Sequence, residues 1–130
     1  MDGPVVHLTL DDILHMVRML GIGPVRDIGL IDAAVARSRS TAYGTDAYPT
    51  LELKAAALLE SLVGNHALVD GNKRIAWLAT VVFLGLNGVM VTLDDDAAFD
   101  LVMDAAQRRL PLEAIANRLV PDVEPDTRLD

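Results

Sequence analysis

The residues best equipped for chemistry in this chain lie together in one short stretch, residues 65–74, with the sequence NHALVDGNKR. An imidazole, a carboxylate, a glycine, two carboxamides and two cations fall here between two strongly apolar segments, 50–63 and 75–86. His66 is the candidate general base, because an imidazole titrates near neutral pH and can accept the proton of a hydroxyl group. The chemistry expected here is therefore proton transfer beside a charged loop.

The first turn of the helix that follows predicts an anion site. Asp70 is a suitable N-cap, and Gly71 would then leave the backbone open to close approach. Lys73 and Arg74 conflict with the partial positive charge of a helix N-terminus, at a cost of about 0.3–1 kcal/mol each. A bound anion would remove the conflict, since free amide groups and both cations would point at it. We therefore predict that a phosphate group is held by Gly71, Asn72, Lys73 and Arg74.

The carboxylate next to this site also suggests a metal ion. Asp70 is a candidate ligand for a divalent cation that bridges phosphate oxygens, because hard cations prefer oxygen ligands. A site made of His66 and Asp70 alone is a weaker hypothesis, since two ligands seldom suffice. Each residue has a plain structural explanation as well: Asp70 as a cap, Lys73 and Arg74 as a solvated pair, His66 as a loop residue. Their concentration in one loop favours the functional interpretation.

The pattern HxxxDGNKR at residues 66–74 resembles the signature loop of the Fic/Doc superfamily. It is most similar to that of the Doc (death on curing) toxins of Phd/Doc toxin–antitoxin systems, in which a lysine, here Lys73, replaces the second glycine of the usual Fic motif. The resemblance extends roughly over residues 9–120. Leu68 stands where the family has an aromatic residue, and we expect it to anchor the loop. Trp77 stands where Fic enzymes proper have a second arginine, as expected of a Doc-like chain.

The resemblance implies an activity. Doc toxins use Mg²⁺ and ATP to phosphorylate a threonine of elongation factor Tu, which arrests translation, whereas Fic enzymes transfer AMP. By this resemblance the chain is expected to be a toxin and a kinase-like transferase, which modifies a Thr or Ser hydroxyl of a translation factor such as elongation factor Tu. His66 would take the proton and Asp70 would hold Mg²⁺. Lys73 would fill the space that a glycine leaves, so that the nucleotide binds with its γ-phosphate presented to the acceptor hydroxyl.

Two alternatives stay open at the level of sequence. One is Fic-type transfer of AMP to a protein hydroxyl. The other is a non-catalytic helical module whose anion site recognises a phosphate or carboxylate of a partner. The presence of Leu68 in place of an aromatic residue is consistent with this alternative. A mutation of His66 separates the classes, because it removes an activity in one case and only weakens binding in the other.

Partners are implied as well. Doc toxins are neutralised by the C-terminal segment of a Phd-type antitoxin, and this chain has no internal inhibitory pattern of the Ser/Thr-x-x-x-Glu-Gly/Asn kind. We therefore expect an apolar groove between helices that accepts such a segment. In Fic relatives, the region that matches the polar connection at 40–49 is a flap that docks the target. Tyr43, Gly44 and Tyr48 are the candidate docking residues there.

Composition limits the other possibilities. The 130 residues carry a net charge of −8, which argues against direct, non-specific binding of nucleic acid, because neutralising phosphates needs clustered Lys and Arg. No apolar run reaches the roughly 18 residues that a membrane span needs. The start of the chain lacks the basic region of a signal peptide, and there is no cysteine. A cytoplasmic protein is therefore expected.

Periodicity and capping signals predict an all-α, single-domain bundle of about six helices over residues 1–120, with a frayed tail at 121–130. In addition to Asp70, the predicted N-caps are Thr9, Thr50 and Asp94. The helices are expected at residues 9–20, 30–39, 50–63, 70–86, 94–109 and 111–119.

Two side chains on these helices carry specific predictions of burial. Lys54 is expected on the exposed side of the helix at 50–63. Trp77 is expected in the core, because aliphatic residues surround it in the sequence.

Overall fold

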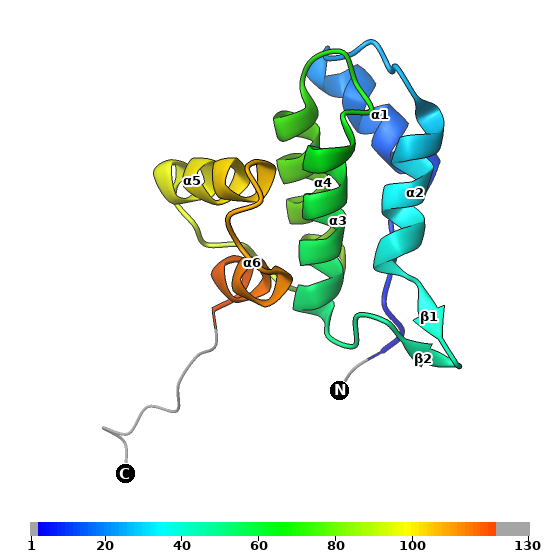
Figure 1. Ribbon diagram of the computed structural model, residues 1–130, viewed down its shortest axis with the longest axis vertical. Helices are drawn as coiled ribbons and strands as arrows, with labels where there is room; N and C mark the ends of the chain where they lie inside the picture. The colour runs from blue at the N-terminus through cyan, green and yellow to red at the C-terminus, as the bar shows by residue number, and fades with distance from the viewer. Residues whose placement is uncertain (1–2, 122–130) are drawn as a thin grey trace.

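Six α-helices make up nearly all of the regular structure within residues 3–121, the part of the chain that the computed structural model describes (Figure 1). The helices are α1 (Leu10–Leu20), α2 (Ile28–Ser38), α3 (Leu51–Asn65), α4 (Asn72–Leu86), α5 (Asp95–Ala106) and α6 (Leu112–Leu119). Two short antiparallel strands, β1 (Thr41–Ala42) and β2 (Thr45–Asp46), lie between α2 and α3. The prediction of an all-α fold with about six helices is confirmed.

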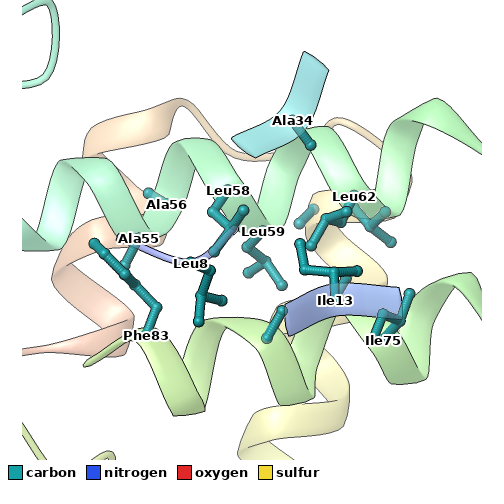
Figure 2. Packing of buried hydrophobic residues seen from close by; sticks show 14 of the residues in the cluster. Leu8, Ile13, Ala34, Ala55, Ala56, Leu58, Leu59, Leu62, Ile75 and Phe83 are labelled. Carbon is teal, nitrogen blue, oxygen red and sulfur yellow. The ribbon is translucent and has the colours of Figure 1, made fainter. Parts of the chain in front are cut away.

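α3 is the central helix of the bundle. It packs against α2, α4, α5 and α6, and nine of its 15 residues are buried. A helix that is apolar around most of its circumference must be covered on several sides, as the Leu- and Ala-rich sequence of this segment predicts. Figure 2 shows Leu59 and Leu62 of α3 in one buried cluster with Ile13 of α1 and Phe83 of α4.

Three of the four predicted N-caps are confirmed. Thr9, Thr50 and Asp94 each accept a hydrogen bond from the amide group three residues further on, at 3.2, 3.1 and 2.8 Å respectively. Each bond satisfies one of the amide groups that a helix start leaves unpaired, and such a cap contributes about 1 kcal/mol. α6 begins directly after Pro111, also as predicted.

Four helix boundaries differ from the prediction by two or more residues. α3 ends two residues later than expected, at Asn65, and α4 begins two residues later, at Asn72. α2 begins at Ile28, two residues earlier than expected, because the Asp27 side chain caps it by accepting a hydrogen bond from the amide two residues on, at 3.0 Å. α5 ends at Ala106 and not at residue 109. Arg108 takes a left-handed conformation with φ of 56° there, and the next amide donates back to a carbonyl oxygen five residues earlier at 3.0 Å, which closes the helix.

No helix within residues 3–121 is long and apolar enough to cross a membrane. The two longest, α3 and α4, have 15 residues each, whereas a span needs about 20. The predicted tail at 121–130 lies, beyond Pro121, outside the described residues.

Candidate active site

The stretch singled out in the sequence forms the loop at residues 66–71, which joins α3 to α4 at one end of the bundle (Figure 1). The connection between α1 and α2 runs beside this loop. The amide of Val69 donates to the carbonyl oxygen of Pro24 at 3.0 Å, and the amide of Gly23 donates to that of Asp70 at 3.1 Å. The loop is therefore braced by a segment more than 40 residues earlier in the chain. This brace was not predicted, because backbone pairing between two irregular segments leaves no periodic pattern in the sequence.

His66 ends α3 in a left-handed backbone conformation, with φ of 53° and ψ of 46°. Residues other than glycine seldom adopt this conformation, and it recurs where function requires it. The residue is exposed, and its carbonyl oxygen accepts a hydrogen bond from the guanidinium group of Arg26. The backbone of the candidate base is thus held from the α1–α2 connection while the imidazole stays accessible to a substrate hydroxyl.

Leu68 lies in the core with only 2% of its surface exposed, so its side chain ties the loop to the bundle. Its backbone is held by Asn72. The side-chain oxygen of Asn72 accepts from the Leu68 amide at 3.0 Å, and the side-chain nitrogen donates to the Leu68 carbonyl oxygen at 2.9 Å. The carboxamide that we predicted to bind phosphate is therefore engaged in bracing the loop, with one N–H group left for a ligand.

The start of α4 corrects one prediction. Gly71 and not Asp70 is the N-cap, with φ of 96°, and no side chain caps this helix. The glycine is required for a further reason: a Cβ atom at Gly71 would lie 2.6 Å from the Cβ of Ile22. The space expected to admit a ligand at this residue is therefore filled by a side chain from the α1–α2 connection. The Asp70 carboxylate, which does not cap the helix, is exposed at the loop surface.

The first turn of α4 nevertheless has the properties of an anion site. Its leading amide groups have no capping side chain, and it contains no acidic residue. Lys73 and Arg74 are both exposed in this turn. Free amides, the positive end of the helix dipole and two cations thus lie together, which is the arrangement that binds phosphate at helix N-termini.

A metal ion would find an incomplete ligand set here. Among residues 3–121, no group of three or more His, Asp or Glu side chains is placed to hold a metal ion. Asp70 can supply one carboxylate at the loop. A divalent cation at Asp70 would have to take its other oxygen ligands from phosphate groups and water, which is the usual way in which Mg²⁺ binds with nucleotides.

An apolar groove of about 410 Å³ opens beside the anion site, between α4 and α5. Its charged lining residues are Lys73, Arg74 and Asp95, and Trp77, Phe99 and Met103 are among the others. The prediction that Trp77 lies in the core is met only in part, because Trp77 packs against the core cluster but is only partly buried. Phe99 is 64% exposed. α5 turns another face toward α3, so these large side chains border a groove instead of filling the core.

The predicted docking residues lie far from His66. Tyr43 and Gly44 form the turn of the β1–β2 hairpin, with φ of 54° and 79°, and Tyr43 is fully exposed. The hairpin precedes α3 and His66 follows it. The two are therefore separated by the length of a 15-residue helix, about 22 Å (Figure 1). The structure does not bring the expected flap beside the candidate base.

Tyr48 and Lys54 fasten this hairpin to the bundle. Tyr48 accepts a hydrogen bond from Nε of Arg37 at 2.8 Å. Lys54 was predicted to be exposed, but it is 3% exposed, and its ammonium group donates to Oδ2 of Asp46 at 3.0 Å and to the Tyr48 carbonyl oxygen. Burial lowers the pKa of Arg37, but its hydrogen bonds to Tyr48 and Glu60 outweigh burial and raise the pKa above its ordinary value. Tyr48 is thus an anchor of the hairpin and not a free contact surface.

Comparison with known proteins identifies the class of this chain. Residues 7–84, which include the whole loop, match the Fic/DOC family. The chain therefore belongs to the Fic/DOC family, as the pattern at residues 66–74 indicated. A curated relative, named Toxin Doc, from Mycolicibacterium smegmatis (strain ATCC 700084 / mc(2)155), is 58% identical over 97 residues, which cover 73% of this chain and 75% of the relative.

Proposed function

We propose that this chain is the toxin of a toxin–antitoxin system and a cytoplasmic, Mg²⁺- and ATP-dependent kinase-like enzyme. Its substrate is a Thr or Ser hydroxyl of a translation factor such as elongation factor Tu. The observation that carries the proposal is the meeting of two features at one loop: the exposed residue His66, and an uncapped helix N-terminus that bears Lys73 and Arg74. The similarity to a protein named Toxin Doc supports the toxin assignment.

The proposed step is an in-line phosphoryl transfer. His66 takes the proton of the acceptor hydroxyl, whose oxygen bonds to the γ-phosphorus while the bond from phosphorus to the β,γ-bridging oxygen breaks and ADP leaves. Lys73, Arg74 and the free amides of α4 hold the phosphate groups and stabilise the charge that develops on them. Asp70 would hold Mg²⁺, which supplies charge neutralisation between phosphate oxygens.

The position of Lys73 favours transfer of the γ-phosphate over transfer of AMP. This lysine lies in the first turn of α4, where a glycine would leave the helix N-terminus open for the phosphate chain to run deeper. A lysine fills that room and adds a cation at its edge. The terminal phosphate is then the group held nearest to the acceptor hydroxyl.

The groove between α4 and α5 fits the predicted antitoxin segment. An amphipathic helix binds such a groove through an apolar face, and Phe99 and Trp77 offer aromatic surface for it. Because Lys73 and Arg74 line the groove, an acidic residue of the segment would pair with them. A bound Phd-type segment would therefore cover part of the anion site and so inhibit the enzyme.

The direct test uses the full-length protein in a bacterial translation extract, with Mg²⁺ and ATP labelled at either the α- or the γ-phosphate. We expect a protein of the extract to become labelled from the γ position alone. His66→Ala should lower the rate by at least about 100-fold, because general-base catalysis typically contributes that much. His15→Ala is the matched control, since His15 is an exposed histidine of α1 outside the loop.

The other outcomes separate the alternatives. Label from the α position would show AMP transfer and overturn the kinase assignment. A fully active His66→Ala protein would overturn the role of the base. No label from either position, together with phosphate-dependent binding of a partner, would favour the non-catalytic module.

A further inference from the structure

A cavity with both polar and apolar lining lies outside the candidate active site, where α2, α3 and the end of α5 meet. Its volume is about 190 Å³. At about 30 Å³ for each water molecule, it has room for roughly six waters, or for one phosphate-sized ion with a few waters. Among the residues that line it are Arg37, Glu60, Ser61, Gly64, Asn65 and Arg108.

The first unusual feature of this cavity is the backbone of Arg108. Within residues 3–121, three residues other than glycine have a positive φ: Tyr43 at the tip of the hairpin, His66 and Arg108. Arg108 closes α5 with φ of 56°, a position where glycine is strongly preferred because it has no Cβ atom. An arginine at this position therefore has a conformational cost that a glycine would avoid.

The second unusual feature faces the first. Gly64 lies in the last turn of α3, although glycine is less favourable than alanine within a helix. A Cβ atom at Gly64 would lie 3.9 Å from Nη2 of Arg108, which is an ordinary contact, so alanine would fit. Two locally unfavourable choices therefore border one cavity. Such conflicts between sequence and local structure concentrate at functional sites.

The donors of the cavity are already oriented. Nη1 of Arg37 donates to Glu60 at 2.8 Å and to Ser61 at 3.0 Å, which fixes the plane of its guanidinium group. Asn65 donates one N–H to the carbonyl oxygen of Leu30 at 3.1 Å and has a second N–H. Arg108 takes part in none of the ion pairs found within residues 3–121.

The side chains that line the cavity carry a net positive charge, since Arg37 and Arg108 contribute two positive charges and Glu60 one negative charge. The C-terminal ends of α3 and α5 each add roughly half a negative charge through the helix dipole, so these groups are nearly balanced. The guanidinium of Arg108 is the cation at the cavity that has no ion-pair partner among residues 3–121.

We infer that this cavity is a second oxyanion site, which binds phosphate through the guanidinium groups of Arg108 and Arg37 with Asn65 as a further donor. The planar guanidinium group of Arg108 can bind two oxygens of phosphate with parallel hydrogen bonds. Arg37 can add only Nη2, because its Nε and Nη1 already donate to Tyr48, Glu60 and Ser61. The phosphate can be free or the end group of a small phosphomonoester, since both present the same terminal oxygens. The inference is independent of the catalytic role proposed for His66.

The test is a phosphate titration followed by NMR on the full-length protein, with chloride used to keep the ionic strength constant. The reporters are the backbone amide of Gly64 and the side-chain amide of Asn65, which line this cavity, and the backbone amide of Lys73, which reports on the loop site. We expect both sets to shift in a saturable manner. A parallel titration with O-phosphoserine distinguishes the free ion from a phosphomonoester.

Arg108→Gly is the decisive variant, because it removes the cation and also relieves the left-handed backbone. We expect it to raise Tm by about 2–8 °C and to weaken phosphate binding at the Gly64 and Asn65 reporters by at least roughly tenfold. Binding at Lys73 should be unchanged. Arg109→Ala is the matched control, since Arg109 is exposed and pairs with Asp104 outside the cavity.

A Lys73→Ala/Arg74→Ala double variant should show the reverse pattern, with binding lost at the loop and kept at the cavity. The inference is overturned if Gly64 and Asn65 do not shift, if chloride alone shifts them equally, or if Arg108→Gly leaves the affinity unchanged. In each of these cases Arg108 serves only to pair with the C-terminal end of α3.

Discussion

At the scale of single residues, the loop at 66–71 depends on two left-handed backbone conformations. His66 leaves α3 with φ of 53°, and Gly71 enters α4 with φ of 96°. The first conformation turns the chain so that the imidazole remains at the surface. The second is available at low cost only to glycine, and Ile22 also occupies the position of a side chain there. The geometry of the loop is therefore sensitive to a single methyl group.

Gly71→Ala is expected to lower the free energy of unfolding by about 2–4 kcal/mol. About 1–2 kcal/mol of this comes from the left-handed backbone, and the rest from displacing Ile22, whose Cβ would lie 2.6 Å from the new atom. The measurement is urea denaturation.

Gly88→Ala is the control for Gly71→Ala. Gly88 has a similar φ of 85°, but a Cβ added there would have no other atom within 4 Å, so only the backbone cost should appear. Equal losses in the free energy of unfolding of the two variants would show that Ile22 moves aside freely and that the close contact does not affect stability.

At the scale of elements, the β1–β2 hairpin is fixed by side chains of α2 and α3. Arg37 of α2 donates to Tyr48, and Lys54 of α3 donates to Asp46 and to the Tyr48 carbonyl oxygen. An ammonium group can be buried at this position because its hydrogen-bond donors have partners. The hairpin is consequently held as a defined projection, although each strand has only two residues.

Lys54→Met should release this hairpin. Methionine keeps the length of the side chain but leaves the Tyr48 carbonyl oxygen without its donor, at a cost of about 1–3 kcal/mol. We expect lower stability in urea and faster chymotrypsin cleavage after Tyr43. Lys73→Met, at an exposed position, is the control and should be cleaved at the rate of the parent protein and be at least as stable, because it removes a cation from a helix N-terminus. Unchanged cleavage in Lys54→Met would mean that Arg37 and Tyr48 suffice to hold the hairpin.

The groove between α4 and α5 gives a second prediction at this scale. Phe99→Asp should weaken binding of the antitoxin segment by at least roughly tenfold, since aromatic anchors dominate such interfaces, and it should leave the fold intact because Phe99 is 64% exposed. The measurement is titration of the purified protein with the C-terminal peptide of the antitoxin. Met19→Asp, at a 73% exposed position on α1, is the control. Equal affinity of both variants would place the segment elsewhere.

At the scale of the whole molecule, the N-terminal segment gives the stability a dependence on pH. His7 stacks on Phe83 of the core, with ring centroids 5.8 Å apart, and its Nδ1 is buried without a hydrogen bond. Burial, together with the positive charges of Arg39 and Lys54, lowers the pKa of His7 below its ordinary value of 6.5. Below pH 6.5 the unfolded chain therefore binds more protons at this residue than the folded chain does.

The stability that neutral His7 contributes should be complete above pH 6.5 and should fall as the pH drops from 6.5 through the lowered pKa. Urea denaturation between about pH 5 and pH 8 measures this. His7→Leu should flatten the curve in that window, whereas the exposed His15→Leu should not. A slope that persists in His7→Leu would assign the dependence on pH to other groups.

The sequence by itself determined the features that depend on near neighbours in the chain. Thr9, Thr50 and Asp94 cap their helices because a cap bonds to an amide three residues away. The Leu- and Ala-rich pattern made α3 central for an equally local reason, since it leaves no polar face. The pattern at residues 66–74 likewise indicated the family and the loop.

Only the tertiary structure decided what meets this loop and what does not. Ile22 fills the space over Gly71, and the carboxamide of Asn72 is hydrogen-bonded to the backbone of Leu68. Lys54 is buried because the hairpin folds back onto it. The predicted flap lies one helix length away from His66. Each of these depends on how segments distant in sequence pack together, and a periodic pattern along one segment carries no information about its partner.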